Sequence, residues 1–177
     1  MKNIKILLFL FLTIFTISAC GSANVMQADL YVAKNSGFKI DFPNEPKVLN
    51  EAVPTEGGDV NVTYYVSEKE GDGVAYMVTY SKYSQELFDT LDKTNLLENG
   101  LRGGLSLWNI QAPVEAQDIT IDGYKGLYYR ADNGHNFVIA NLYLVDNALY
   151  QVVVISEKAY VPDNLVNKFM SSFVLLR

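Results

Sequence analysis

The 177-residue sequence contains a single cysteine, Cys20, and a single histidine, His135. With one cysteine the chain forms no internal disulfide, so its folded part must rely on a hydrophobic core. One histidine provides little for a metal site, because such sites combine several ligands at defined spacing. It also provides little for a serine triad, since no Gly-x-Ser-x-Gly motif accompanies His135. We therefore expect no metal, no cofactor and no enzymatic activity.

Positive charge is also scarce in this chain. Lysine and arginine total 14 residues against 20 aspartates and glutamates, the formal net charge is −6, and no basic run occurs. Phosphate backbones and anionic lipid surfaces are bound through positive patches. We therefore expect neither a nucleic-acid partner nor adsorption to a membrane through charge.

The apolar run near the start, Ile6–Ser18, is shorter than the roughly 20 residues that span a bilayer. Lys2 and Lys5 precede it and small residues follow it, which is typical of a secretory signal peptide. The segment Ile17-Ser18-Ala19-Cys20 resembles the lipobox of bacterial lipoproteins, in which an aliphatic and two small residues precede a cysteine. The resemblance implies diacylglyceryl transfer to Cys20, with palmitate-type acylation, and cleavage after Ala19. The alternative is an ordinary signal peptide that contains a cysteine.

This reading divides the chain into a signal peptide (1–19), a tether (20–29) and one domain (30–177). Cleavage would leave 158 residues with 12 basic and 20 acidic side chains, a net charge of −8. A flexible tether of this length reaches about 15 Å, which keeps the domain near the membrane. Gly21 stands after the cysteine where an aspartate would favour inner-membrane retention in Gram-negative bacteria. We expect a monomer in the cell envelope, on the outer membrane facing the periplasm in a Gram-negative cell.

Apolar alternation predicts a sheet built from hairpins. The stretch Ile119–Ser156 has three apolar runs, separated by a tight-turn pattern at Asn133-Gly134 and a weaker one at Asp146-Asn147. These runs are apolar on both sides of the chain, so we expect this part of the sheet to be covered on both faces. The other expected strands are Leu30–Val32, an edge strand at Gly37–Pro43, a short strand at Lys47–Val53 within the loop 44–58, the hairpin Asp59–Ser67 with Val74–Tyr83, and Pro113–Ile121.

Two stretches have helical periodicity instead. Residues 85–107 repeat an apolar position at every third or fourth residue, which predicts one amphipathic helix. The pair Gly103-Gly104 lowers helix stability by about 1 kcal/mol per glycine relative to alanine, so we expect the helix to fray or end there. A second helix is expected after Pro162. Its apolar face comprises Leu165, Val166, Phe169, Met170 and Phe173. The order of elements predicts an α+β fold with a mainly antiparallel sheet and helices packed on it.

Four segments resemble PsbP-like bacterial lipoproteins over nearly all of residues 36–177. They are Gly37–Pro46, Asp122–Gly126, Leu142–Gln151 and Phe169–Phe173. The resemblance implies a PsbP-like sandwich, a fold named for an extrinsic subunit of photosystem II and shared with a Ran-binding nuclear-transport protein. Known members mostly bind other proteins and are not enzymes. Because the shared motifs are structural, they indicate the fold and not the partner.

Candidate functional residues are few. His135, near Asp132, follows the Asn-Gly pair, and we interpret it as an exposed turn residue and not a metal ligand. Tyrosines are abundant in the expected strands, where they fit either strand packing or a binding surface. These are Tyr64, Tyr65, Tyr76, Tyr80, Tyr83, Tyr124, Tyr128 and Tyr129.

Three functions are compatible with this sequence. We expect a lipid-anchored, non-catalytic binding or assembly module that acts on an envelope protein. The alternatives are a carrier of a small apolar ligand, held in a pocket between helix and sheet, and an enzyme that uses carboxylates among the 20 acidic residues. An open groove or a flat apolar patch on the folded domain would identify the binding surface.

Overall fold

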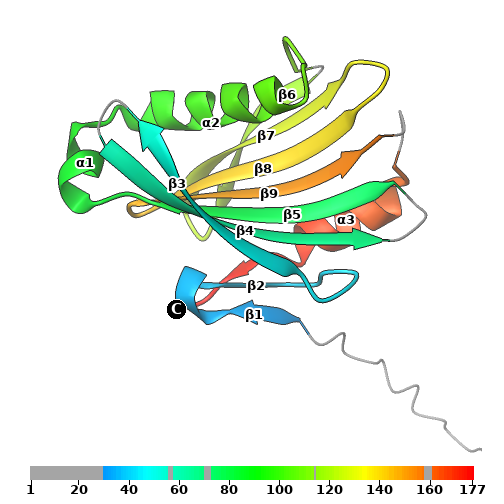
Figure 1. The fold of residues 1–177 in the computed structure, drawn as a ribbon, viewed down its shortest axis with the longest axis horizontal. Helices are drawn as coiled ribbons and strands as arrows, with labels where there is room; N and C mark the ends of the chain where they lie inside the picture. Colours follow the sequence, from blue (N-terminus) through cyan, green and yellow to red (C-terminus); the bar gives the residue numbers. More distant parts are fainter. Residues whose placement is uncertain (1–29, 56–57, 70–72, 114, 158–160) are drawn as a thin grey trace, which may run out of the picture.

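The computed structural model describes residues 30–55, 58–69, 73–113, 115–157 and 161–177. The main feature is a seven-stranded antiparallel sheet in the order β3-β4-β5-β9-β8-β7-β6 (Figure 1). Its strands are β3 (Lys47–Thr55), β4 (Gly58–Lys69), β5 (Val74–Lys82), β6 (Glu115–Ile121), β7 (Tyr124–Asp132), β8 (Phe137–Val145) and β9 (Ala148–Ser156). The predicted α+β class with a mainly antiparallel sheet is therefore confirmed.

A small sheet and three helices complete the described structure. The small sheet has the order β1-β2-β10 and is also antiparallel. Its strands are β1 (Tyr31–Ala33), β2 (Phe38–Ile40) and β10 (Val174–Leu175), with the 3-10 turn η1 (Lys34–Ser36) between the first two. The helices are α1 (Gln85–Thr90), α2 (Lys93–Leu107) and α3 (Asp163–Ser171).

The two faces of the large sheet carry different layers. Leu105 of α2 packs with Tyr129, Val138 and Leu142 of β7 and β8, which places α2 on one face. On the other face, α3 and the small sheet pack against alternate residues of the same strands (Figure 1). Strands β8 and β9 lie between the two layers and are buried along nearly their whole length. The expectation that this stretch is covered on both faces is confirmed.

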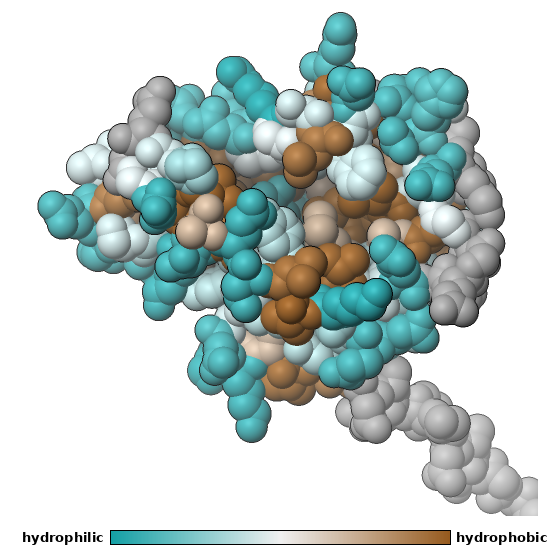
Figure 2. All heavy atoms as spheres, in the orientation of Figure 1, coloured by the Kyte–Doolittle hydropathy of each residue, from teal (hydrophilic) through white to brown (hydrophobic). Residues whose placement is uncertain are grey.

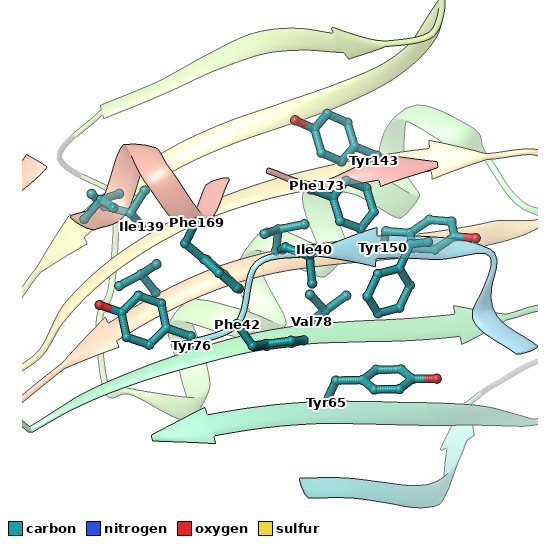
Figure 3. Close-up of a cluster of buried hydrophobic side chains, with 14 of the residues drawn as sticks. Ile40, Phe42, Tyr65, Tyr76, Val78, Ile139, Tyr143, Tyr150, Phe169 and Phe173 are labelled. Atoms are coloured by element: carbon teal, nitrogen blue, oxygen red, sulfur yellow. The ribbon is translucent and has the colours of Figure 1, made fainter. Parts of the chain in front are cut away.

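Aromatic rings form the core between the small sheet and the large one (Figure 3). The Phe38 ring meets that of Tyr65 edge to face at 5.0 Å, and the Phe173 ring stacks on Tyr143 at 5.9 Å. Ser36 adds two hydrogen bonds to this core. Its hydroxyl bonds the Tyr65 hydroxyl at 2.7 Å, and its carbonyl accepts from the Tyr150 hydroxyl at 2.8 Å. These contacts fix the small sheet on the large one, as expected for a chain without a disulfide.

Several expected boundaries are corrected by the structure. The segment around Phe38 is not an edge strand, because β1 and the distant β10 pair with it on either side. The short strand expected at Lys47–Val53 is confirmed and is longer than expected, since β3 continues to Thr55 and pairs with β4 over its whole length. The expected single helix is divided at Leu91, whose backbone is extended, and Asp92 caps α2 by accepting from the Asn95 amide.

The pair Gly103-Gly104 does not end the second helix, which continues to Leu107. Tertiary packing accounts for the difference, since Leu105 is buried against the sheet.

The turns also differ from expectation in detail. Asn133-Gly134 joins β7 to β8 as predicted, but the loop is four residues long and only Gly134 of the pair has positive φ. Among the described residues, tight two-residue turns occur at Asp146-Asn147, between β8 and β9, and at Asp122-Gly123, between β6 and β7. Both residues of Asp122-Gly123 have positive φ, at 48° and 86°, as a type I′ turn requires.

Candidate ligand-binding groove

An apolar groove runs between helix α2 and the part of the large sheet formed by β3, β4 and β5. It has a volume of about 680 Å³ and is open to solvent on one side. We call it the α2 groove. Its helical wall comprises Leu87, Leu91, Leu96, Gly100, Gly103, Leu107 and Trp108. The strand side comprises Val53, Val60, Val62, Tyr64, Met77, Thr79, Ser81, Gln151 and Val153.

The groove exists because α2 covers only half of its face of the sheet. The core under α2 draws its strand residues from β7, β8 and β9. Val62, Tyr64 and Thr79, on β4 and β5, share that face but line the groove instead. Figure 2 shows hydrophobic residues gathered in a recess of the molecule below α2. A concave apolar surface of this kind is typical of small-molecule sites, which measure about 300–1,000 Å³.

Helix α2 contains three glycines, and two of them set the distance between helix and sheet. A Cβ at Gly100 would lie 2.9 Å from a Leu142 methyl carbon, and one at Gly104 would lie 2.5 Å from the Tyr129 hydroxyl. These two glycines therefore allow the helix to approach the sheet closely. A Cβ at Gly103 would meet nothing within 4 Å, although Gly103 lines the groove. The absence of a side chain at Gly103 thus keeps part of the groove open.

Polar side chains also line the groove, and three of them lie together on β5 and β9. Thr79 of β5 lies directly opposite Gln151 of β9 in the strand register, and Ser81 is the next residue of β5 on the same face. Thr79 is 4% exposed, and its hydroxyl oxygen has no hydrogen-bond partner among the described residues. Most buried polar groups in proteins are hydrogen-bonded, so this buried, unpaired hydroxyl is unfavourable for folding.

The groove is electrically neutral. Among the described residues that line it, none carries a charged side chain, although the whole chain has a net charge of −6. Its tyrosines keep their protons, because burial raises the pKa of Tyr129 to about 12 and also raises the pKa of Tyr83. The groove therefore provides apolar surface and neutral hydrogen-bonding groups but no countercharge.

A second hollow of about 840 Å³ lies at the other side of α1 and the start of α2, facing β6 and β7. It is lined by charged residues as well as apolar ones, including Lys93, Asp118, Lys125 and Asp146. Asp146 accepts a hydrogen bond from the Tyr124 hydroxyl at 3.2 Å, and Lys93 lies 5.0 Å from the Phe88 ring centroid. Its charged lining resembles ordinary protein surface, so the α2 groove is the better candidate site.

His135 is exposed in the β7–β8 loop, as expected from the sequence. Neighbouring Asp132 and Asn133 cap this loop by accepting hydrogen bonds from the backbone amides of Gly134 and His135. In the described ranges, no group of three or more histidine, cysteine or acidic residues is placed to hold a metal ion.

The tyrosines of the expected strands could serve strand packing or a binding surface, and the structure places them in both the core and the groove. Tyr65 and Tyr76 pack in the aromatic core, and Tyr129 is 1% exposed beneath α2. Tyr64, Tyr83 and Tyr129 also line the α2 groove. Some tyrosines of the set therefore pack in the core, others line the groove, and Tyr129 does both.

The predicted lipidation site, Cys20, lies outside the described residues, together with the signal peptide and the tether. In the part of the chain that the structure describes, no helix is both long and apolar enough to span a membrane.

Sequence reasoning placed a possible pocket between helix and sheet but missed the residues that form it. Thr79 and Gln151 are ordinary strand residues in the sequence, and their pairing depends on a register between strands that are distant in the chain. Gly103 was interpreted as a helix breaker. Gly103 lies two residues from Leu101 and so outside the apolar stripe through Leu97, Leu101 and Leu105, and no local pattern in the sequence pointed to it.

No protein family matches the sequence, and no curated protein matches it either.

Proposed function

We propose that this chain is a lipid-anchored protein of the cell envelope that binds a ligand without transforming it, and that the α2 groove is its binding site. The observation that carries the proposal is the groove itself, a concave, uncharged surface of about 680 Å³ between helix and sheet. Of the functions expected from the sequence, the carrier of a small apolar ligand fits this geometry best. Attachment through Cys20 would hold the groove close to the membrane surface, on the periplasmic face of the outer membrane in a Gram-negative cell.

We further propose that the domain is a PsbP-like sandwich. The motifs behind that resemblance have structural roles here that support it. The Asp122-Gly123 turn supplies two positive φ angles. A Cβ at Gly126 would overlap the Leu142 carbonyl oxygen, so β7 and β8 need glycine at that position.

The proposed function is tested by the molecules that copurify with the protein. The full-length chain is isolated from membranes as wild type, as Gly103→Phe and as Gly103→Ala, and bound small molecules are identified by mass spectrometry. The phenylalanine ring would occupy the open space at Gly103, whereas the alanine methyl leaves most of the groove free. We expect a small molecule enriched with the wild type and Gly103→Ala and depleted from Gly103→Phe. Identical profiles for all three proteins would contradict the proposal.

A protein partner is the second candidate, favoured by the free edge of strand β3. Val48 and Leu49, consecutive residues of this edge strand on opposite faces of the sheet, are 45% and 59% exposed, which is unusual for large apolar side chains. Exposed edge strands can pair with a strand of another protein. Cross-linking from position 49 in intact cells, with position 118 of β6 on the opposite edge as control, tests this candidate. A specific protein adduct at position 49 alone is expected if this edge is used.

A further inference from the structure

Strand β3 forms one edge of the large sheet, and no described strand pairs with its outer side (Figure 1). Every residue from Lys47 to Ala52 is exposed. Pro54 lies near the far end of the strand and cannot donate a backbone hydrogen bond. The segment 47–52 is therefore the part of this edge that another strand can reach and pair with.

A hydrogen bond at the end of the β5–β9 pair shows which backbone groups of β3 point outwards. The Tyr83 amide donates to the Asn147 carbonyl at 2.9 Å and continues this ladder by one pair. Hydrogen-bonded and non-hydrogen-bonded pairs alternate in antiparallel strands, so the odd-numbered residues of β5 bond to β9 and the even-numbered ones to β4. Through the continuous registers of β5, β4 and β3, the odd-numbered residues of β3 then bond to β4. The unpaired backbone groups of the edge belong to Val48, Asn50 and Ala52.

The odd-numbered side chains of β3 lie on the α2 face of the sheet. Leu49 is opposite Tyr64 and Glu51 is opposite Val62, and both of these β4 residues line the α2 groove. Lys47 shares this face, because side chains two residues apart point to the same side of a strand. Lys47 and Glu51 are exposed, and within the described ranges neither forms an ion pair. The edge therefore carries a positive, an apolar and a negative side chain in a row.

We propose that β3 pairs with β3 of a second copy of this chain, antiparallel and about a twofold axis between the two copies of Leu49. Lys47 then lies opposite Glu51 of the second copy, and the symmetry repeats this ion pair on the other side of the axis. The two copies of Leu49 face each other between the ion pairs and cover exposed apolar surface. Val48 and Asn50 of the second copy exchange both of their free backbone hydrogen bonds. This dimer replaces the monomer expected from the sequence.

The charges select this register over the neighbouring ones. An axis at Lys47 or at Glu51 would place two like charges directly opposite each other, which is destabilising. An axis at Val48 or at Asn50 would place Lys47 opposite an apolar side chain and leave the charges unpaired. A lysine on an edge strand usually discourages pairing, but Glu51 of the second copy supplies its countercharge here. The inference rests on the use of the β3 edge proposed above and adds the identity of the partner.

A disulfide between two introduced cysteines tests the pairing. Opposite residues of a non-hydrogen-bonded pair have Cα atoms about 4.5 Å apart, within the range of about 4.4–6.8 Å that a disulfide spans. The full-length chain carrying Leu49→Cys is oxidised mildly in membranes. Disulfide-linked dimers are quantified on non-reducing gels and identified by mass spectrometry.

Two controls accompany this variant. Val48→Cys is the matched control, because Val48 is exposed on the same strand but lies opposite Asn50 of the second copy and not opposite itself. The wild type controls for cross-linking through Cys20. We expect a dimer from Leu49→Cys alone.

Charge reversal in the Leu49→Cys chain tests the register. Lys47→Glu or Glu51→Lys alone places like charges opposite each other, and we expect each to lower the initial rate of dimer formation about tenfold. Co-expression of the two variants should restore the rate, because each chain then supplies the charge that the other lacks. Damage to the fold of one chain would not be rescued in this way.

The outcomes separate this inference from the proposed functions. Equal dimer formation by Val48→Cys and Leu49→Cys, or no dimer from either, would overturn the pairing of two copies. Dimer formation that is insensitive to charge reversal, or that co-expression does not restore, would overturn the register. An adduct of position 49 with a different protein, in place of the dimer, would overturn the second copy as the partner while supporting a protein partner at this edge. The α2 groove is tested separately, by the copurification experiment.

Discussion

At the scale of single residues, the most informative side chain is one that lowers the stability of its own fold. The Thr79 hydroxyl is buried without a partner among the described residues, and such a group is unfavourable by about 1–3 kcal/mol. Two strand neighbours on the same face, Met77 and Val153, are apolar, whereas Gln151, directly opposite, is polar. A valine at position 79 would satisfy the packing equally well, so folding alone does not explain the threonine.

Thr79→Val is therefore expected to raise the free energy of unfolding by about 1 kcal/mol, because it removes an unsatisfied buried hydroxyl. Chemical denaturation of wild type and variant under the same conditions measures the difference. The matched control is Thr63→Val on β4, whose hydroxyl donates to Asn50 at 2.9 Å and is exposed. That substitution should leave stability unchanged or slightly lower. A clear loss of stability in Thr79→Val would mean that the hydroxyl has a partner in the folded protein.

Tyr129 gives a second prediction at this scale, in the pH dependence of stability. Burial raises its pKa from 10.0 to about 12, so the folded state holds the phenolic proton more tightly than the unfolded state. This contribution is fully present below pH 10 and is lost as the pH rises through the folded pKa. Tyr129→Phe should therefore show a smaller fall in denaturation midpoint between pH 9 and about 11 than the wild type. Part of the fall should remain, because burial also raises the pKa of Tyr150. Equal falls in both proteins would contradict the assignment.

At the scale of elements, helix α2 determines whether a groove exists. It packs on β7 and β8 through Leu105 and its neighbours and leaves β4 and β5 uncovered on that face. Gly104 and Gly103 are adjacent but have opposite surroundings, since one faces the Tyr129 hydroxyl and the other faces open space.

Alanine at these two positions should have opposite effects. Gly103→Ala is expected to stabilise the protein by up to about 1 kcal/mol, because alanine favours the helix and meets no neighbour. Gly104→Ala is expected to destabilise it by about 1–3 kcal/mol, because the methyl group would collide with buried Tyr129. Thermal denaturation of both variants measures whether each substitution raises or lowers the stability of the protein. Stabilisation by both substitutions would show that α2 can move away from the sheet.

The helices and strands also show which features of the fold can be predicted from local sequence patterns. Periodicity located the hairpins, the amphipathic stretch 85–107 and the helix after Pro162, because local apolar spacing reflects the face that each element buries. It did not predict that Gly37–Pro43 lies in the middle of a sheet, since its partner β10 is more than 130 residues away along the chain, as the Val174–Lys39 pair shows. It placed the short strand Lys47–Val53 inside a loop because Pro46 and Pro54 are strong turn residues, although proline is tolerated at the edge of a sheet.

The candidate site was less predictable than the fold for the same reason. A groove depends on where a helix fails to cover a sheet, and this is set by tertiary packing and not by local pattern. The unpaired state of Thr79 could not be inferred from sequence at all, because it depends on every neighbour in space.

At the scale of the whole molecule, we propose that a lipid anchor is attached to a binding domain. The described elements begin at residue 30, and the anchor is predicted at Cys20, about ten residues earlier in the chain. Two acyl chains hold a protein stably at a membrane, because each buried methylene group contributes about 0.8 kcal/mol. A hydrophobic ligand would therefore have a short path between the bilayer and the groove.

Cys20→Ala is expected to prevent lipidation and signal cleavage at residue 19, and to move the protein out of the acylated membrane fraction. Intact mass measurement of wild type and variant detects the acyl groups, and Ser18→Ala serves as a control that keeps a small residue before the cysteine. Cleavage of the variant after residue 19, together with no acyl mass on the wild type, would refute the lipoprotein assignment.

Trp108 allows occupancy of the α2 groove to be measured directly, because it is the only tryptophan in the sequence and lines this groove. A brominated long-chain alcohol quenches tryptophan fluorescence on contact, so it reports occupancy of the groove in the full-length protein in membranes. We predict saturable quenching in the wild type and in Gly103→Ala, and only weak, non-saturable quenching in Gly103→Phe, whose ring fills the space beside α2. Equal, non-saturable quenching in all three proteins would contradict the conclusion that the α2 groove is a ligand-binding site.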